Sequence, residues 1–477
     1  MSTFKSSWFK DFKFTTNEQT QPKIEQTAPI FSLPNELLFD IFDYLDSKSS
    51  QSISKTCKRF NTLINDTPKL LERLKVQLNS NKIGNDWIGS RKYSTIYIDG
   101  SAAIFFFDIF IEIGENISHL YLNGNGMEMK VLKKILLLMP NLTVLSLGCD
   151  DEEVISEPVD LIEPLPERFF RIFEFSGTNQ NFKIFLNCQA KVFKLTRDYK
   201  DKTVNDENFK KFLKKQTKLE SLLLGNFEKE SSMFSDRTLN EVQFKLKTLR
   251  FYQFEAYELP NFKLFIDNFK ESLTYLELDL TDCTVLEDFR EFPNLKTVSL
   301  IKMFYLELEA PMNFVEDLII ENVKVPLAES FPNITRMTIL DYLKKPSQVK
   351  NFKKLEFLEI SSIDVAELKI PTVKKLRFCG TSFLCPHPFK FDGNQIKELM
   401  IEEVEEIEWL NEYLERQDTK LKLLELKGVF INAKLQKTIE QNKQKIEQLV
   451  IMRCDLEVEK FIVRKDINLT FYEISIQ

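Results

Sequence analysis

Few residues in this chain have the types and spacing that covalent chemistry needs. The only histidines, His119 and His387, are the usual candidates for a base near neutral pH. His119 falls inside an alternating apolar segment, which favours a surface position on a strand over a catalytic role. The sequence has no GxxxxGK[ST] phosphate loop. Gly124-x-Gly126 lacks a third glycine and predicts a turn. We therefore predict no catalytic residue.

One segment has a loosely metal-like spacing. The sequence CGTSFLCPH contains Cys379, Cys385 and His387. Structural zinc takes four ligands, and no fourth Cys or His is adjacent. The chain has seven cysteines, and none of them forms a CxxC pair. This dispersed set indicates reduced thiols and a location in the cytoplasm and/or the nucleus. We expect no metal and no cofactor.

The charge pattern argues against two classes of partner. A net charge of −7 is unsuited to general nucleic-acid binding, which needs a basic surface. No stretch approaches the ~18–20 uncharged apolar residues of a membrane span. The acidic run from Glu402 to Glu408 follows a predicted strand. A solvated face is its favoured interpretation, and a site for a basic protein is the alternative.

The first elements that could position a binding surface lie in residues 31–75. Their apolar residues fall on one wide helical face and then, after a polar break, on a second one. The two sets are Leu37, Leu38, Ile41, Phe42 and Leu45, and Ile53, Cys57, Phe60, Leu63 and Ile64. About 45 residues bury only a small core. We therefore expect a helical module whose exposed face is completed by a partner.

This module resembles an F-box. Three segments carry the resemblance: Leu33-Pro34-x-Glu-Leu-Leu, Ile41-Phe-x-Tyr-Leu and Cys57-Lys-Arg-Phe-Asn. The Leu that the family has early in its second helix is absent, and Ser50, Gln51 and Ser52 lie near that position. The alternative is a plain helical cap on the domain that follows.

The resemblance implies partners and a docking site. F-box modules dock on the Skp-type adaptor of cullin–RING (SCF) ubiquitin ligases, so that adaptor and, through it, the ligase are the expected partners. Truncating a central docking residue is expected to cost ~2 kcal/mol or more of binding free energy. The implied docking residues are Leu33, Pro34, Leu37, Leu38, Ile41, Phe42, Leu45, Ile53, Cys57 and Phe60.

Three segments outside the module have no clear apolar period. We expect residues 1–30 to be a disordered tail, in which Trp8 and the phenylalanines after it are either coincidental or a short docking segment. Residues 76–92 are the expected linker. The acidic, proline-rich segment 149–166 is an expected surface loop.

Residues 93–477 repeat the unit apolar-x-x-apolar-x-apolar at intervals of 18 to 29 residues. The sixteen copies start at Tyr93, Ile117, Leu142, Phe170, Ala190, Leu219, Leu246, Leu273, Leu295, Val315, Ile334, Leu355, Val373, Ile396, Leu421 and Ile446. Several follow an apolar-Pro-Asn-apolar turn, as at Pro140-Asn141. Asn125 stands where the signature LxxLxLxxN has its asparagine. The pattern resembles that of leucine-rich repeats.

The repeats predict an α/β solenoid of about sixteen units. A curved parallel sheet would line its concave face, with helices and loops on the convex face. The longer units have room for helices, which we expect at Met127–Met139, Asn205–Gln216, Asn261–Glu271 and Ala433–Lys445. The shorter units at residues 273–373 have room only for 3₁₀ or extended returns.

Function is then expected on the concave face, where the residues between the inward leucines point. The predicted substrate-binding residues are Tyr97, Tyr121, Arg250, Tyr252, Tyr275, Arg336, Phe357 and Arg377, with Glu277 and Glu359 beside them. A merely solvated face is the alternative, and the arginines would pair a phosphate if they clustered. The resemblance to F-box and leucine-rich-repeat proteins thus implies the substrate-recognition subunit of an SCF-type ligase, with a protein substrate. The alternative is a non-degradative binding scaffold.

Overall fold

A computed structural model gives two compact units, Met1–Leu74 and Lys75–Gln477. It describes residues 29–71, 74–78, 93–99, 107–123, 128–148, 162–197, 206–228, 231–235, 237–255, 261–279, 289–303, 310–322, 328–340, 346–361, 369–370, 372–380, 390–391, 396–404, 407–416, 420–456, 468–472 and 475–476. In these ranges no helix has the length and apolar character that crossing a membrane requires. The predicted surface loop lies mostly outside them, as do Cys385 and His387.

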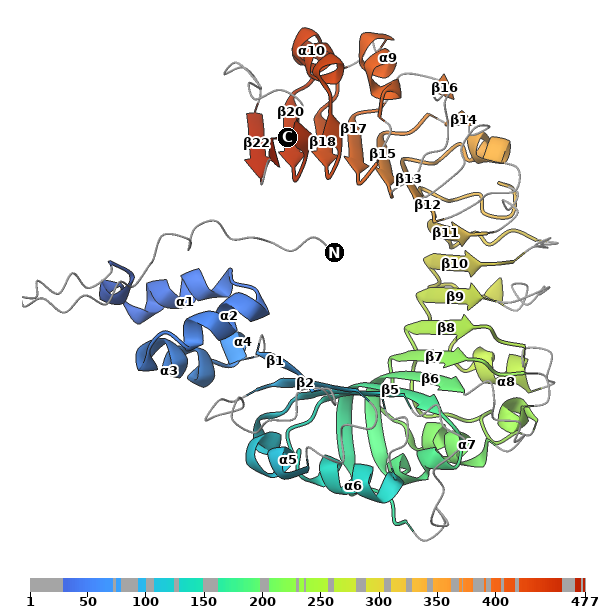
Figure 1. Cartoon of the computed structure of the whole chain (residues 1–477). Helices are drawn as coiled ribbons and strands as arrows, with labels where there is room; N and C mark the ends of the chain where they lie inside the picture. Colours follow the sequence, from blue (N-terminus) through green and yellow to red (C-terminus); the bar gives the residue numbers. More distant parts are fainter. Residues whose placement is uncertain are drawn as a thin grey trace, which may run out of the picture. The chain divides into compact units, whose positions relative to one another are not determined.

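The first unit is a small helical module (Figure 1). Its elements are a 3₁₀ turn (Pro29–Ser32), α1 (Asn35–Asp43), α2 (Ser47–Ser54), α3 (Lys58–Asp66) and α4 (Pro68–Leu71). Pro29 and Ile30, which were expected in the tail, belong to the 3₁₀ turn, and residues 1–28 lie outside the described ranges. The core holds Leu38, Phe42, Phe60, Ile64 and Leu70, all of them buried.

Helix α2 shows what replaces the missing leucine. Its sequence SKSSQSIS has a single large apolar residue, Ile53. Ser50 and Ser54 are buried instead, so small side chains face the core. The start of the helix is stabilised by Asp46, whose carboxylate accepts a hydrogen bond of 2.6 Å from the Ser49 amide. Capping thus offsets the small apolar area of this helix.

The second unit is built on an 18-stranded parallel sheet within the described residues. Each strand pairs with the next main strand along the chain, with its residues in register, as Tyr97 opposite Tyr121 shows. The strands are β1 (Lys75–Leu78), β2 (Thr95–Asp99), β3 (His119–Asn123), β4 (Val144–Gly148), β5 (Arg168–Gly177), β6 (Cys188–Arg197), β7 (Ser221–Gly225), β8 (Thr248–Tyr252), β9 (Tyr275–Asp279), β10 (Thr297–Ile301), β11 (Asp317–Glu321), β12 (Arg336–Ile339), β13 (Phe357–Ser361), β15 (Lys375–Cys379), β17 (Glu398–Glu402), β18 (Leu423–Lys427), β20 (Gln448–Met452) and β22 (Asn468–Tyr472). Two small sheets are also present. One has two strands, β14 (Lys369–Ile370) and β16 (Lys390–Phe391), and the other has three, β19 (Phe430–Ile431), β21 (Asp455–Leu456) and β23 (Ser475–Ile476).

Each of the sixteen predicted repeats contains one strand of this sheet. In β3, for example, Leu120 and Leu122 are buried while Tyr121 between them is half-buried. The sequence missed the first and last strands, β1 and β22. The expected linker 76–92 is therefore corrected at its start, because residues 75–78 form β1 and pair with β2. Val76 and Leu78 are buried there.

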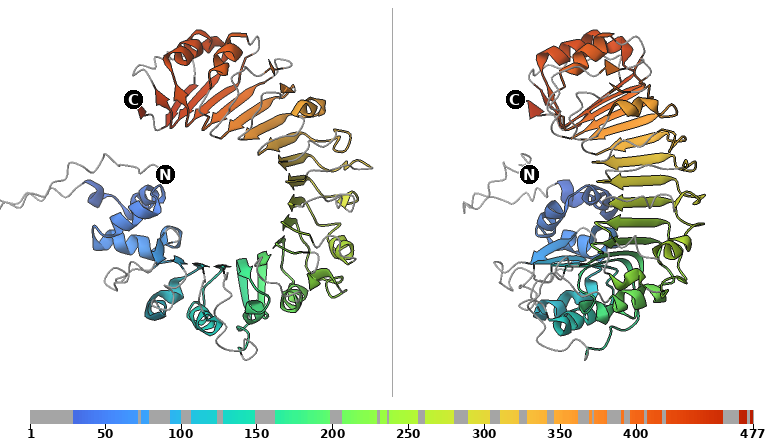
Figure 2. Two further views of the ribbon diagram at one scale, coloured as in Figure 1. Left: turned by 45° about the vertical axis from the view of Figure 1, so that its right-hand side comes forward. Right: turned by 90° about the vertical axis from the view of Figure 1, so that its right-hand side faces the viewer.

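Helices cover one face of the sheet, and the strands line the other, concave face (Figures 1 and 2). The helices are α5 (Phe107–Ile113), α6 (Met129–Leu137), α7 (Glu207–Lys215), α8 (Phe262–Asp267), α9 (Trp409–Arg416) and α10 (Ala433–Gln441). The four predicted helices are thus present, each somewhat shorter than expected. Helices α5 and α9 were not predicted. The returns described between α8 and α9 contain 3₁₀ turns such as Pro346–Asn351 and no α-helix.

The Pro-Asn turns join neighbouring repeats through side-chain hydrogen bonds. Asn141 Nδ2 donates to the Glu115 carbonyl at 2.7 Å, and Asn294 donates to Glu271 at 2.8 Å. Asn333 makes the same bond to the carbonyl one repeat earlier, at 2.6 Å. The sequence signal therefore marks an asparagine ladder before the strand.

The position that follows the strand carries no such ladder where it is described. There the buried residue is apolar, as for Phe227, Phe254, Val404, Val429 and Cys454. Asn125, expected at this position, lies outside the described residues. Phenylalanine is also abundant deeper in the core. Phe173 alone contacts six other Phe rings at centroid distances from 4.8 to 6.5 Å.

Candidate functional site

The apolar band of α1 divides into two faces. Leu38 and Phe42 are four residues apart and fully buried. Leu37 and Ile41, also four apart, lie on another side of the helix and are 49% and 40% exposed. Tyr44 follows at the C-terminal end of α1 and is 91% exposed. Exposed apolar residues at this spacing form a surface that a partner can cover.

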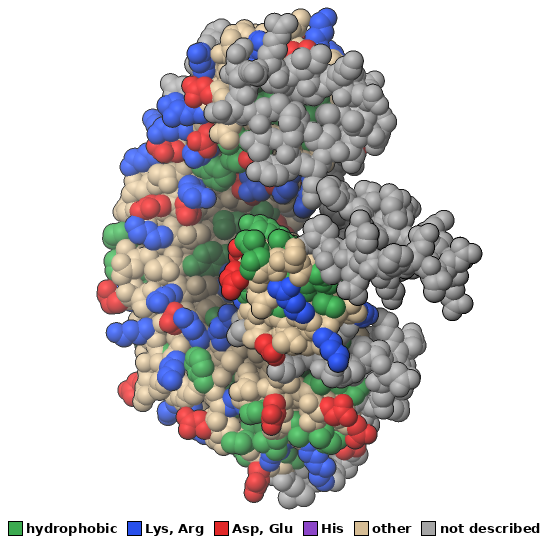
Figure 3. Space-filling view, turned by 90° about the vertical axis from the view of Figure 1, so that its left-hand side faces the viewer, with side chains coloured by type: hydrophobic (Ala, Val, Ile, Leu, Met, Phe, Trp, Pro, Cys, Tyr) green, Lys and Arg blue, Asp and Glu red, His purple; other side chains and the backbone are tan. Residues whose placement is uncertain are grey.

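Phe31 is a further exposed apolar residue, in the 3₁₀ turn before the helix. It is 41% exposed, and its ring stacks on Phe60 at 5.2 Å with an interplanar angle of 17°. Phe60 in turn meets Phe42 edge-on at 5.2 Å. The exposed ring is therefore supported by the core. We call Phe31, Leu37, Ile41 and Tyr44 the docking face, and Figure 3 shows exposed hydrophobic side chains among charged ones on the N-terminal module.

Arg59 fixes the segment that leads into α1. Its guanidinium donates to the Phe31 carbonyl at 2.7 Å and to the Leu33 carbonyl at 2.6 Å. It also donates to Asn35 Oδ1 from two nitrogens, at 3.0 and 2.8 Å. A planar, multidentate donor suits this task better than a lysine. The Cys-Lys-Arg-Phe-Asn segment thus sets the position of the Leu-Pro segment.

The ten predicted docking residues fall into three groups. Leu38, Phe42 and Phe60 are buried, so they hold the module together and present no surface of their own. Pro34, Leu37 and Ile41 are exposed. Leu33, Leu45, Ile53 and Cys57 are half-buried. The prediction omitted Phe31 and Tyr44. Tyr44 was detectable because it follows Ile41 by three residues on the same helical face.

In the second unit, the predicted residues of the concave face alternate with the buried leucines. Tyr97 and Tyr121 lie on β2 and β3, and Arg250 and Tyr252 lie on β8. The others follow at Tyr275, Arg336, Phe357 and Arg377, on β9, β12, β13 and β15. Each strand offers these side chains from its first, third and fifth positions.

Strands β8 to β13 pair cations with aromatic rings. Arg250 lies 5.1 Å from the centroid of Tyr275, and Arg336 lies 5.1 Å from that of Phe357. Lys302, directly after β10, lies 5.9 Å from the ring of Tyr252. Such contacts hold a cation over an aromatic face at a modest gain in free energy.

The same three cations have carboxylates nearby, beyond hydrogen-bond length. The distances are 4.0 Å for Arg250 to Glu277, 3.9 Å for Lys302 to Asp279 and 3.7 Å for Arg336 to Asp317. Burial, followed by the hydrogen bond to Glu277, raises the pKa of Tyr275 to about 12. Tyr275 therefore stays protonated and donates to Glu277 at 2.7 Å. We call strands β8 to β13 the aromatic–charged strip.

The arginines do not cluster around one phosphate. Arg250 and Arg336 are separated by four strand-to-strand steps, which is about 19 Å at ~4.8 Å per step. Arg377 is already bound by Glu402 at 2.5 Å and lies 3.5 Å from Glu359. The possibility of a shared phosphate site is therefore wrong for these three residues.

A second charged group lies on β15 to β18, where Lys427 and Arg377 both donate to Glu402. The Lys427 hydrogen bond is the largest cause that lowers the pKa of Glu402 below its ordinary 4.5, and the Arg377 bond adds to it. This part of the acidic run is thus neutralised internally. Glu405 and Glu406 lie outside the described residues.

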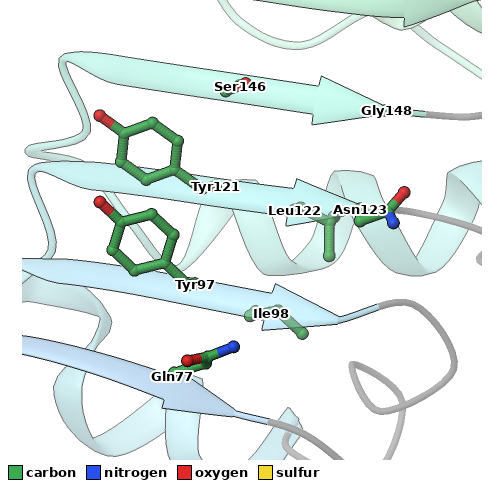
Figure 4. Close-up of a pocket in the computed structure, with 8 residues that line it drawn as sticks. All are labelled: Gln77, Tyr97, Ile98, Tyr121, Leu122, Asn123, Ser146 and Gly148. Carbon is green, nitrogen blue, oxygen red and sulfur yellow. The ribbon is translucent and has the colours of Figure 1, made fainter. Parts of the chain in front are cut away.

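A hollow of about 390 Å³ lies on the concave face over strands β1 to β4. Eight residues line it: Gln77, Tyr97, Ile98, Tyr121, Leu122, Asn123, Ser146 and Gly148 (Figure 4). Tyr97 and Tyr121 stack in parallel there, 4.6 Å apart at 10°. Burial raises the pKa of Tyr121 above its ordinary value, so its hydroxyl is protonated near neutral pH.

The histidine and cysteine side chains that could do covalent chemistry lie in environments that do not favour it. His119 lies 2.7 Å from Ser118 Oγ and 3.2 Å from an Arg171 nitrogen. Burial raises the pKa of Cys379 and disfavours its thiolate. No group of three metal-ligating side chains occurs in the described ranges, and the four cysteines described there are free.

Comparison with known proteins identifies the N-terminal module. An F-box-like family matches residues 30–77. No curated protein matches the chain. The solved structure of the mouse RP105/MD-1 complex is similar over 76% of this chain and 71% of that chain, at 14% identity and a TM-score of 0.35, which is too low to support an inference.

An F-box-like module followed by a parallel solenoid of leucine-rich-repeat type defines a protein-interaction adaptor. Both of its candidate sites are surfaces suited to proteins. This chain accordingly combines an F-box-like module at residues 30–77 with a solenoid of leucine-rich-repeat type. Such architecture is typical of non-catalytic components of SCF ubiquitin ligases.

Proposed function

We propose that this chain is the substrate-recognition subunit of an SCF-type ubiquitin ligase in the cytoplasm and/or the nucleus. The F-box-like module would bind a Skp-type adaptor, and the solenoid would bind the target protein. The observation that carries the proposal is the exposed docking face on a module that matches the F-box-like family. An uncovered row of Leu37, Ile41 and Tyr44 is hydrophobic surface that adaptor binding would bury.

The proposed contribution to ubiquitin transfer is proximity. The chain would hold a lysine of the target near the ubiquitin carrier and thereby raise its effective concentration. The chain itself would supply no reacting group. The aromatic–charged strip supports the substrate role, because Tyr and Arg dominate the energetics of many protein interfaces. Its exposed Arg336 and Asp317 pair only loosely, at 3.7 Å, and would be able to meet charges of a partner.

The test is recovery of the adaptor and cullin from cells with the wild-type chain and with Leu37→Asp/Ile41→Asp. Both substituted positions are exposed, so the module should keep its fold. We expect the wild type to recover both proteins and the variant to lose them. Phe314→Asp changes a similarly exposed residue of the solenoid and should have no effect. A wild type that recovers neither protein contradicts the proposal.

A binding scaffold without a degradative role is the second candidate. The observation that favours it is the serine-rich α2, which lacks the large apolar residue expected there. The discriminating measurement is turnover of the proteins that co-purify with the solenoid. Turnover that slows in the Leu37→Asp/Ile41→Asp variant supports the ligase subunit. Unchanged turnover, with the adaptor still bound to the wild type, supports the scaffold.

A further inference from the structure

The hollow over β1 to β4 is bounded by an interrupted aromatic stack. Tyr97 and Tyr121 occupy the same position on adjacent strands, and the next residue in that row is Ser146 on β4. Ser146 has no ring, and Gly148 beside it has no side chain. Figure 4 shows the two tyrosine rings parallel and the small residues of β4 next to Tyr121. The stack therefore ends where the lining becomes small.

The geometry of the stack matches the spacing of the sheet. The ring centroids are 4.6 Å apart, close to the ~4.8 Å between neighbouring strands. A third ring in the same orientation would lie over Ser146, against the Tyr121 face opposite Tyr97. Gly148 leaves this part of the lining without a side chain. A Cβ at this position would lie only 3.3 Å from Asn123 Oδ1.

The lining selects an uncharged ligand. All eight lining residues are uncharged. The neighbouring charges are engaged, since Glu174 accepts from Ser146 at 2.9 Å and pairs with Lys194. A charged group placed in the hollow would lose hydration without gaining an opposite charge. The amides of Gln77 and Asn123 offer donors and acceptors at the edge.

We propose that this hollow is an aromatic slot, which binds a Phe, Tyr or Trp side chain from an exposed segment of a partner protein. The ring stacks on Tyr121 as the third member of the row. The Asn123 and Gln77 amides hydrogen-bond the backbone of the same segment. This deepens the proposed function, because it gives the partner of the solenoid a chemical class, yet it does not require adaptor binding.

The slot is tested on the full chain with N-acetylated amino-acid amides observed by saturation-transfer NMR. The Phe, Tyr and Trp amides should bind more tightly than the Leu amide, by about two- to tenfold for one stacked ring pair. The Lys and Glu amides should not bind. Equal binding of the Leu amide, or preferential binding of a charged amide, overturns the proposal.

Two substitutions locate the binding. Ser146→Phe supplies the third ring from the chain itself and should abolish binding, whereas Tyr121→Ala should weaken it. Val450→Phe places the same ring on β20, in the corresponding row but outside the aromatic–charged strip, and should leave binding unchanged. A crystal structure of Ser146→Phe should show the new ring stacked on Tyr121. Unchanged amide binding by Ser146→Phe contradicts the slot.

The partner itself is sought with a displayed peptide library panned on the wild type and counter-selected on Ser146→Phe. Enrichment of peptides with one aromatic residue supports the slot, and enrichment without aromatics overturns it. Binding that appears only after removal of residues 1–28 would assign the slot to the chain's own aromatic tail, against the proposal. Ser146→Phe should still bind the Skp-type adaptor. Loss of amide binding and loss of adaptor binding are therefore separate results.

Discussion

At the scale of single residues, a few polar side chains carry much of the organisation. Arg59 binds two backbone carbonyls and one amide oxygen of the segment before α1. Asn141 and its equivalents join one repeat to the next. Glu402 holds cations from two strands. Each interaction joins residues far apart in the sequence, so a single substitution has a local and measurable effect.

Arg59→Ala should loosen the segment that carries Phe31 and Leu33. The exposed guanidinium contributes little to global stability, but four hydrogen bonds fix the segment beside the docking face. We expect faster amide hydrogen exchange over residues 31–35 and adaptor binding weakened by about tenfold. Lys58→Ala, one residue earlier in α3, is the control and should change neither. Unaltered exchange in Arg59→Ala would show that the segment is held by other contacts.

Two serine substitutions in α2, Ser50→Ala and Ser54→Ala, should have different effects on the stability of the helical module. Ser50 Oγ is buried without a hydrogen-bond partner, so its removal should be neutral or stabilising. Ser54 Oγ donates to the Gln51 carbonyl at 2.8 Å, so its loss should cost about 1 kcal/mol. Hydrogen exchange of α2 in the full chain measures both effects. Equal destabilisation by the two variants would contradict this assignment.

Glu402→Gln should make the solenoid less stable at neutral pH. The pKa of Glu402 is lowered in the folded chain, chiefly by its hydrogen bond from Lys427. A lowered folded-state pKa gives stability that is present above the ordinary value of 4.5 and is lost as the pH falls through the folded value. The melting temperatures of wild type and variant should therefore converge below pH 4.5. A constant difference across this range would contradict the ion-pair account.

At the scale of elements, α1 shows how one helix serves two purposes. Leu38 and Phe42 build the core of the module, while Leu37 and Ile41 remain at its surface. The sequence predicted the helix and its wide apolar band. It did not separate the two faces, because helical phase relative to α3 and α4 depends on packing between elements.

Phe42→Ala and Ile41→Ala should separate these two faces experimentally. Removing the fully buried Phe42 ring should cost about 3–5 kcal/mol, enough to unfold a module of this size. Ile41→Ala should change stability by less than about 1 kcal/mol while weakening adaptor binding. Limited proteolysis of the full chain detects the first effect. Resistance of Phe42→Ala to cleavage within residues 29–71 would contradict the described core.

The repeats show the same division between what a sequence specifies and what it leaves open. Sixteen strands were predicted because three inward residues recur at fixed spacing. Strands β1 and β22 were missed because end strands stack on one neighbour only and keep fewer of those positions apolar. The pairing of Arg250 with Glu277 and Tyr275 was not predictable, since it depends on the register of separate repeats. The same holds for the slot formed by Tyr121 and Ser146.

At the scale of the whole molecule, two surfaces with different chemistry lie on two compact units. The docking face is a small apolar surface formed by α1 and the 3₁₀ turn before it. The concave face of the solenoid is a long surface of aromatic, polar and charged residues. A chain that binds one protein through each surface brings the two into proximity without a catalytic group of its own. Binding of the adaptor through α1 is the central claim, because the ligase assignment depends on it.

The most direct measurement is the affinity of the purified full chain for a purified Skp-type adaptor, compared with that of Ile41→Asp. We predict saturable one-to-one binding by the wild type. The variant should lose about thirtyfold or more in affinity, because a charge replaces a central apolar anchor. Phe314→Asp should bind like the wild type. Absence of wild-type binding, or an Ile41→Asp affinity equal to that of the wild type, would contradict the claim.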